Sequence, residues 1–433
     1  MPATRRSFLS SLAAAATALV AAPDRFFPRV PNAGPPLPFI PPAGPLDQDF
    51  WRELRGQFLI PLDEAFFNTG TLGSQPRVVL DAVTQHMTHV VRDIAHWDYK
   101  PGNEQYFTGY NPELRVREKL AALINAGADE VALAQNATMA MNFVANGVDL
   151  GPGDEVIVMQ NAHTGGRGGW ELRDKRYGAN VRYVTPPAPA ESPEQLLALY
   201  ERATTPQTRV WAIPHLTSGS GAILFPVQAM CQRARERGIL SVIDGAQTLG
   251  HLRIDVRAMG CDAYFSSPHK WLLAPVGTGM LYLRREIHDQ VWATLASAQW
   301  DNHRDGLYRL MQYGTGNLSI LVGLERAIDF HQELGPARVE ERIVGLANRL
   351  RAGLRRINGV FIRSPQHAAL LSATTIWGIQ GVPGPRLQDE LWRIAKVRVR
   401  SNGDGVRHCC HIYNLESEVD RALDAARQIA GAG

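Results

Sequence analysis

The chain has 433 residues, of which 45% are hydrophobic and 20% are charged, with 39 glycines and 28 prolines. This composition excludes a disordered, collagenous or repeat-only protein and predicts a globular chain with an ample core. The 45 Lys and Arg residues nearly balance the 42 Asp and Glu residues, so the formal charge of +3 gives no field that would select a nucleic acid as partner. Four cysteines are too few for a disulfide scaffold.

Residues 1–22 predict an export signal. Arg5 and Arg6 precede Phe8-Leu9, and an alanine-rich apolar run occupies residues 12–22. The run is too short to span a membrane, so no stable membrane span is expected, but it suits the apolar part of a signal peptide. The whole segment resembles a twin-arginine signal, which implies a periplasmic or otherwise exported protein that folds in the cytoplasm first. A frayed alanine-rich helix is the alternative.

Residues 23–45 contain nine prolines, which predicts a stiff, solvated linker before the folded part. Beyond it, short apolar runs that predict buried strands alternate with helical patterns, and this favours a mostly parallel sheet covered on both faces. The expected strands are 155–159, 181–184, 210–213, 239–243, 263–265 and 279–283, and the expected helices include 114–126 and 227–237.

The pattern changes after residue 313, where two long helices are expected and then two more strands. We therefore expect a large α/β domain over residues 46–310 and a smaller α+β domain over residues 311–433. The helices are expected at 321–334 and 337–357, and the strands at 373–379 and 406–413.

Two charged residues end neighbouring strands of the predicted sheet. Asp244 ends the strand that begins at Ile239, and Lys270, one of only five lysines in the chain, follows the strand that begins at Ala263. Ligands of open α/β sheets bind at the carboxyl ends of strands, so the two side chains are expected to converge. A lysine that forms a Schiff base and a carboxylate that keeps a pyridine nitrogen protonated are what pyridoxal phosphate requires. Taken singly, a surface lysine and a helix-capping aspartate are the alternatives.

The residues around this pair resemble a known family. Asp244 and Gln247, followed by Ser-Pro-His-Lys at 267–270, are similar to the aminotransferase class-V branch of the pyridoxal-phosphate fold-type I enzymes, which includes cysteine desulfurases and isopenicillin N epimerase-like proteins. The resemblance extends from about residue 67 to the C-terminus. It implies an aspartate aminotransferase-like fold in which Lys270 is catalytic, Asp244 pairs with the pyridinium and Gln247 meets the ring hydroxyl. Ser267 and His269 would contact the phosphate.

Further positions extend the cofactor site. Ala137 and Thr138 begin a helix whose first-turn amides and dipole suit a phosphate, with Thr138 available as the cap; a plain capped helix is the alternative. His163 matches the family's ring-stacking aromatic residue, and the glycine-rich stretch 165–169 after it is expected to form a loop that shapes the substrate pocket. A structural histidine is the alternative. Thr315 matches a segment that reaches the neighbouring subunit's phosphate and implies a homodimer with shared active sites.

Two residues are expected on the substrate side. The resemblance places Arg407 where the family binds the substrate carboxylate, a task that suits a permanently charged, bidentate guanidinium. Asn68 matches an N-terminal segment that lines the substrate side, with an ordinary turn as the alternative. The family's desulfurases carry a nucleophilic cysteine that residues 396–405 lack, and Ser218 replaces their asparagine over the ring. These departures favour the epimerase-like branch.

The run His408-Cys409-Cys410-His411 does not predict a metal site. Alternate side chains of a strand point to opposite faces, so four ligands cannot converge from one strand, and no metal is expected. A strained vicinal disulfide between Cys409 and Cys410 remains open.

The sequence thus predicts a pyridoxal-phosphate enzyme that acts on a small-molecule amino acid or amino-acid moiety. Aminotransferase comes first, because transamination needs one mobile base, Lys270, and a carboxylate clamp, Arg407. A C–S or β-elimination lyase, a decarboxylating enzyme and an epimerase remain open, including the tailoring of peptides or siderophores in the periplasm. An epimerase needs a second acid/base that the sequence does not identify. A non-catalytic binding protein with this fold is the alternative outside enzymes.

Overall fold

The computed structural model describes residues 47–96, 110–219 and 221–431. All of them belong to one compact unit, residues 38–433. The predicted export signal and proline-rich linker lie outside the described residues. No described helix combines the length and the apolar character that a bilayer crossing requires.

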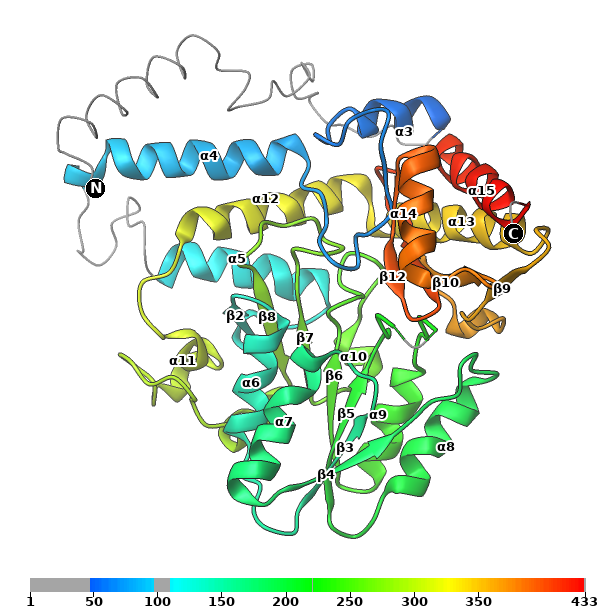
Figure 1. The fold of residues 1–433 in the computed structure, drawn as a ribbon. Coiled ribbons are helices and arrows are strands. Elements are labelled where there is room, and N and C mark those ends of the chain that lie inside the picture. Colours follow the sequence, from blue (N-terminus) through cyan, green and yellow to red (C-terminus); the bar gives the residue numbers. More distant parts are fainter. Residues whose placement is uncertain (1–46, 97–109, 220, 432–433) are drawn as a thin grey trace, which may run out of the picture. The chain divides into compact units, whose positions relative to one another are not determined.

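A seven-stranded sheet forms the centre of the larger part, as Figure 1 shows. Its strand order is β2-β8-β7-β6-β5-β3-β4, and every neighbouring pair is parallel except the two that include β8. The mostly parallel sheet is therefore confirmed, with one reversed strand. The strands are β2 (Val131–Ala134), β3 (Glu155–Met159), β4 (Asn180–Val184), β5 (Thr208–Pro214), β6 (Leu240–Asp244), β7 (Ala263–Ser266) and β8 (Gly279–Leu283).

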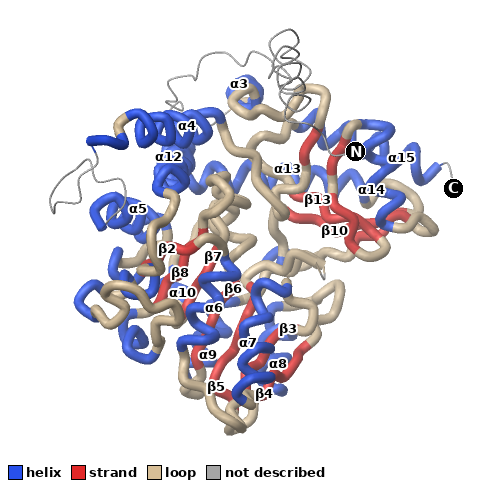
Figure 2. The backbone as a smooth tube through the Cα atoms, turned by 60° about the vertical axis from the view of Figure 1, so that its left-hand side comes forward, coloured by secondary structure: helices blue, strands red, loops and turns tan. Residues whose placement is uncertain are grey.

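Helices connect these strands and lie on both faces of the sheet (Figures 1 and 2). The strands are short apolar runs because both faces are covered, and all residues of β2, β7 and β8 are buried. The buried side chains of these strands and of the helices over them form one continuous core. The helices are α5 (Tyr110–Leu123), α6 (Ala137–Gly147), α7 (Thr164–Tyr177), α8 (Pro193–Ala203), α9 (Val227–Glu236), α10 (Val256–Met259) and α11 (Tyr308–Met311).

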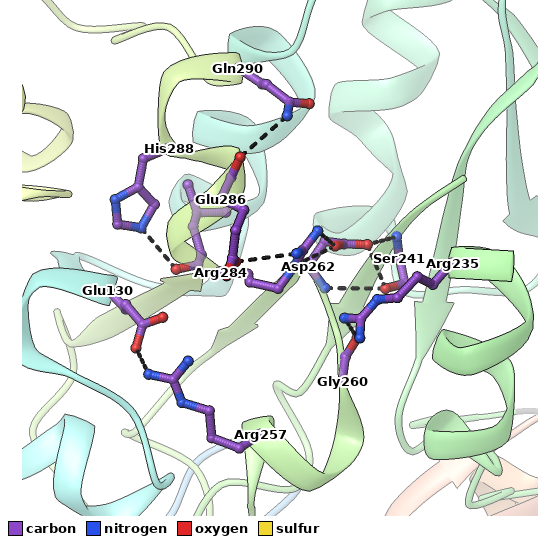
Figure 3. A network of polar contacts seen from close by, with 11 residues as sticks. Glu130, Arg235, Ser241, Arg257, Gly260, Asp262, Arg284, Glu286, His288 and Gln290 are labelled. Atoms are coloured by element: carbon purple, nitrogen blue, oxygen red, sulfur yellow. Dashed lines mark hydrogen bonds and ion pairs between the residues drawn. The ribbon is translucent and has the colours of Figure 1, made fainter. Parts of the chain in front are cut away.

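A polar network secures one edge of this sheet, at the amino ends of its parallel strands (Figure 3). The buried carboxylate of Asp262, just before β7, accepts bonds from the amide and hydroxyl of Ser241 in β6 at 2.8 and 2.9 Å, and it pairs with Arg284 just after β8 at 2.7 Å. Arg257 pairs with the buried Glu130, which precedes β2. The charged groups at the amino ends of the parallel strands thus pair with one another and hold neighbouring strands together.

A second sheet of four antiparallel strands has the order β12-β13-β10-β9. It packs with three helices around a separate core, which includes Trp377, Leu387 and Leu391. The elements are β9 (Val360–Ile362), β10 (Thr374–Ile379), β12 (Arg400–Asn402), β13 (Gly405–Cys409), α13 (Pro336–Leu354), α14 (Gly384–Ala395) and α15 (Glu416–Gly431).

The strand expected over 406–413 is shorter than predicted. It ends at Cys409, because the amide oxygen of Asn414 accepts the His411 N–H at 2.8 Å, and the Asn414 N–H donates to the His411 carbonyl at 2.9 Å. These two bonds close a turn that ends the ladder.

The N-terminal segment joins both cores. Strand β1 (Ala65–Phe66) pairs in parallel with β11 (Val397–Arg398), and helix α3 (Gln48–Arg55) precedes it. Helix α4 (Arg77–Arg92) lies along α12 (Leu318–Leu334), as Figures 1 and 2 show. Buried residues of α12 contribute to both cores, so this helix connects the two parts. The boundary at residues 310 and 311 stays a prediction.

Candidate active site

A cavity lies at the carboxyl ends of β3, β5, β6 and β7, on the sheet edge opposite the network of Figure 3. The structure brings seven of the predicted site residues together in its wall, from four separate segments of the chain. They are Ala137, Thr138, His163, Asp244, Gln247, Ser267 and Lys270. Ser218, expected over the ring, lines the same cavity.

Asp244 and Lys270 are two ionisable groups in a partly buried setting. Burial raises the pKa of Asp244, while its bond from the Ala246 N–H, at 3.0 Å, and the charge of Lys270 act against this rise. Burial also lowers the pKa of Lys270, against the attraction of Asp244. The amine of Lys270 is therefore more often neutral than that of an exposed lysine, which is the form that attacks a carbonyl or accepts a proton.

Gln247 is fixed by two protein contacts. Its amide nitrogen donates to the carbonyl of Gly70 at 2.9 Å, and its amide oxygen accepts from the indole N–H of Trp271 at 2.8 Å. The imidazole of His251 stacks on Trp271 with ring centres 3.8 Å apart. These two bonds fix the orientation of the Gln247 amide in the cavity wall. Sequence analysis missed Trp271, although it directly follows Lys270.

Two helices begin at the cavity. The N-cap of α6 is Asn136, whose side chain accepts from the Met139 N–H at 2.9 Å, so the prediction of Thr138 as the cap is wrong. Asn136 has the extended backbone that a cap needs, whereas Thr138 is already inside the helix. The Ala137 N–H donates to the hydroxyl of Ser267 at 2.9 Å. Thr138 adds a hydroxyl to the cavity wall.

The loop expected at residues 165–169 is also wrong, because these residues form the first turns of α7. His163 is its N-cap, and its Nδ1 accepts the Gly165 N–H at 3.0 Å. Glycines weaken a helix but permit close approach. A Cβ on Gly165 would lie 2.3 Å from the Thr138 hydroxyl, and one on Gly166 would lie 2.3 Å from Asp244 Oδ2. Sequence reasoning missed this use of the glycines.

The cavity wall carries positive charge. Desolvation and then the charge of Lys270 lower the pKa of His163, with smaller contributions from Arg407 and Arg400, while Asp244 acts in the opposite direction. Helices α6 and α7 add the positive ends of their dipoles. This edge of the sheet therefore favours an anionic ligand.

The predicted substrate residues lie beside the cavity and contact each other. Arg407, in β13, donates to the carbonyl of Ser218 at 3.2 Å, to the side-chain oxygen of Asn68 at 3.0 Å and to the hydroxyl of Thr71 at 2.6 Å. Ser218 is part of the cavity wall, so Arg407 connects the second sheet and the N-terminal segment to the site. Thr71 is a further residue that sequence analysis missed.

Two predicted cofactor residues are placed elsewhere. The Nδ1 of His269 lies 3.2 Å from the Thr278 carbonyl, and His269 is not part of the cavity wall. Thr315 is exposed in the turn before α12. Their phosphate contacts stay predictions. Cys409 and Cys410 are buried free thiols in this structure, and a disulfide between them after export stays a prediction.

The donor set defines the ligand that the site can hold. Two helix N-termini and the hydroxyls of Thr138 and Ser267 suit a phosphate, Asp244 suits a protonated ring nitrogen, and Lys270 suits a carbonyl carbon. Gly165 and Gly166 add no side chain of α7 to this wall, which leaves the groups of Thr138 and Asp244 uncovered by that helix. The residues present fit pyridoxal phosphate.

Comparison with known proteins agrees with this geometry. The sequence profile of the aminotransferase class-V family matches residues 66–424. Isopenicillin N epimerase from Streptomyces clavuligerus is 30% identical over 402 residues, which cover 88% of this chain and 98% of that protein.

Two solved structures share the fold. The apo cysteine desulfurase from Thermococcus onnurineus NA1 superposes with a TM-score of 0.77 at 19% identity, covering 88% of this chain and 98% of that one. A variant of C-DES with glycine covalently linked to its pyridoxal-phosphate cofactor superposes with a TM-score of 0.74 at 21% identity, covering 86% and 98%.

Proposed function

The chain belongs to the aminotransferase class-V family of pyridoxal-phosphate enzymes, and from this premise we propose that it catalyses the transamination of a small-molecule amino acid or amino-acid moiety. When bound, the cofactor supplies an electron sink for the pair of electrons left at the substrate Cα. The observation that supports the proposal is that Lys270 is the one lysine in the described cavity wall, which it shares with Asp244, the proposed partner of the ring nitrogen.

Different residues bind the substrate and transfer the proton. Arg407 holds the substrate carboxylate, because its guanidinium is permanently charged and two of its nitrogens already face Ser218 and Asn68 at the cavity. Lys270, whose lowered pKa makes the free amine available, would accept the proton from the substrate Cα and deliver it to the cofactor carbon that is bonded to the amino nitrogen. Both steps occur on the face that Lys270 occupies.

Epimerisation is the second candidate, and the similarity to isopenicillin N epimerase favours it. That reaction needs a second acid/base on the opposite face of the substrate. His163 is the histidine of the described cavity wall, but its Nδ1 is engaged by the Gly165 N–H as the cap of α7. A fixed ring is a poorer proton carrier than a mobile side chain, so transamination ranks first.

A single-turnover experiment separates the two reactions. The purified enzyme with its cofactor is mixed with L-amino acids, including glutamate, and no keto acid is added. Transamination releases one equivalent of keto acid per site and then stops until a keto acid is supplied. A D-amino acid formed without keto acid identifies an epimerase, and pyruvate with ammonia or sulfide identifies a lyase. Either of the last two outcomes overturns the proposal.

We also propose that the protein is exported through the twin-arginine route, on the basis of Arg5 and Arg6 before the apolar run of residues 12–22. Replacing both arginines by lysine keeps the charge and is expected to retain the protein in the cytoplasm. Fractionation of cells that express the two forms tests this. Equal export of both forms contradicts it.

We further propose a homodimer in which Thr315 reaches the partner's cofactor. The exposure of Thr315 in the turn before α12 leaves it available to a second subunit. Sedimentation of the holoenzyme and of Thr315→Ala tests this. The variant is expected to lose cofactor more readily, and a monomeric holoenzyme contradicts the proposal.

A further inference from the structure

Two arginines face each other across neighbouring strands beside the cavity. Strands β12 and β13 are antiparallel, and their register pairs Arg400 directly with Arg407. Residues directly opposite in such a pair lie on the same face of the sheet, with Cβ atoms about 4.5–5.5 Å apart. The side chain of Arg400 therefore lies on the face from which Arg407 reaches Asn68 and Ser218.

Neither arginine has an acidic partner within the described ranges. The contacts of Arg407 are to a carbonyl, an amide oxygen and a hydroxyl, which are all neutral. Arg400 is exposed and takes part in none of the ion pairs formed by described residues. By contrast, nearby Arg363 pairs with Asp404, and Arg393 pairs with Glu390 at 2.5 Å.

Like charges directly opposite each other weaken a strand pair. Two guanidinium groups on one face that no acid neutralises therefore repel each other, and a bound anion would reduce this repulsion. Their charges reach the cavity, because both Arg407 and Arg400 contribute to lowering the pKa of His163. One bound carboxylate would neutralise only one of the two guanidinium charges, so a ligand with two negative charges fits this pair better.

We propose that Arg400 binds a second carboxylate, and that the substrate is an amino acid whose side chain ends in an acid group. Arg407 would hold the α-carboxylate and Arg400 the distal one. This inference rests on the proposed function for the identity of the first contact. It is supported by the cross-strand register of Arg400 and Arg407 and by the absence of a described acidic side chain at either guanidinium.

The experiment compares ligands that differ only in the distal group. Glutamate and glutamine are nearly the same size, so the ratio of their kcat/KM values isolates the distal charge. Arg400→Gln is expected to lower this ratio by about tenfold to a hundredfold, which is the usual range for a lost charge-assisted contact. Arg400→Lys, which keeps the charge, is expected to restore part of it.

Binding without turnover makes the inference independent of the reaction. Calorimetry of the holoenzyme with glutarate and with butyrate measures the preference for a dicarboxylate. Arg400→Gln is expected to reduce this preference by a similar factor, whereas Arg393→Gln, an exposed arginine paired on α14, is the matched control.

The outcomes distinguish the two proposals. If no amino acid yields a keto acid but glutarate binding depends on Arg400, the proposed transamination is rejected. The proposed second carboxylate site at Arg400 is then supported. If keto acids form, and Arg400→Gln changes neither the ratio of the kcat/KM values for glutamate and glutamine nor the binding of glutarate, the second carboxylate site is rejected. The proposed function is then supported.

Discussion

Burial makes Lys270 chemically distinct among the lysines that the structure describes. Lys175, by contrast, is exposed on α7. Lys270→Ala removes the amine that the lowered pKa makes reactive, so we expect turnover to fall by at least about 10³-fold. The measurement is steady-state keto-acid formation, with Lys175→Ala as control. Retained function in Lys270→Ala indicates a binding protein that keeps the site for structural reasons.

The indole of Trp271 orients an amide that faces the cavity. Trp271→Phe leaves the Gln247 oxygen without this donor, so we expect the free energy of unfolding to fall by about 1–3 kcal/mol beyond the packing loss. We also expect faster loss of cofactor on dialysis. Trp170→Phe is the matched control, because the buried indole N–H of Trp170 has no hydrogen-bond partner among the residues that the structure describes. Equal losses in both variants contradict a positioning role for Trp271.

At the scale of elements, the glycines in the first turns of α7 lower its stability as a helix but let it pack closely against Thr138 and Asp244. Gly166→Ala places a methyl group 2.3 Å from Asp244 Oδ2, so we expect it to displace the first turn and to weaken cofactor binding by about tenfold or more. Gly168→Ala meets nothing within 4 Å and is expected to stabilise the helix by about 0.5–1 kcal/mol. Denaturation and cofactor titration of both variants test this. Tolerance of Ala at residue 166 contradicts the close packing.

These elements also show what the sequence can predict. Strands β3 and β8 have the predicted bounds, because strands covered on both faces are continuous apolar runs. Helix α7 was missed because four glycines in its first six residues remove every local sign of a helix. The glycines are explained by tertiary packing, because they let α7 lie close to the side chains of Thr138 and Asp244.

The same division holds for the site. The convergence of Asp244 and Lys270 follows from strand ends in a parallel sheet, so it can be predicted from the sequence. The bond between Trp271 and Gln247 depends on side-chain directions that no local pattern encodes. The pairing of Arg400 with Arg407 requires the register of two strands, which a sequence of this kind leaves open.

At the scale of the whole molecule, five of the buried histidines in the described residues make the folded state more stable at neutral than at acidic pH. Burial lowers the pKa of His215 and His331 to about 4 and that of His251, His408 and His411 to about 3. The unfolded chain binds these protons near pH 6.5 and the folded chain does not, so stability falls as pH drops from about 6.5 towards 4. We expect several kcal/mol of loss by pH 5, seen as a falling midpoint in denaturant titrations. A flat profile over this range contradicts the burial of neutral rings.

The contact of Arg407 with Asn68 spans 339 residues, and it sets an order for biosynthesis. The strands of the seven-stranded sheet all lie between residues 131 and 283, so a growing chain can complete the half of the site that contains Asp244 and Lys270 before β13 has been made. A ribosome-bound chain at that stage has a place for the cofactor but no clamp for the substrate carboxylate. The last part of translation therefore converts a binding surface into a site that can select its substrate.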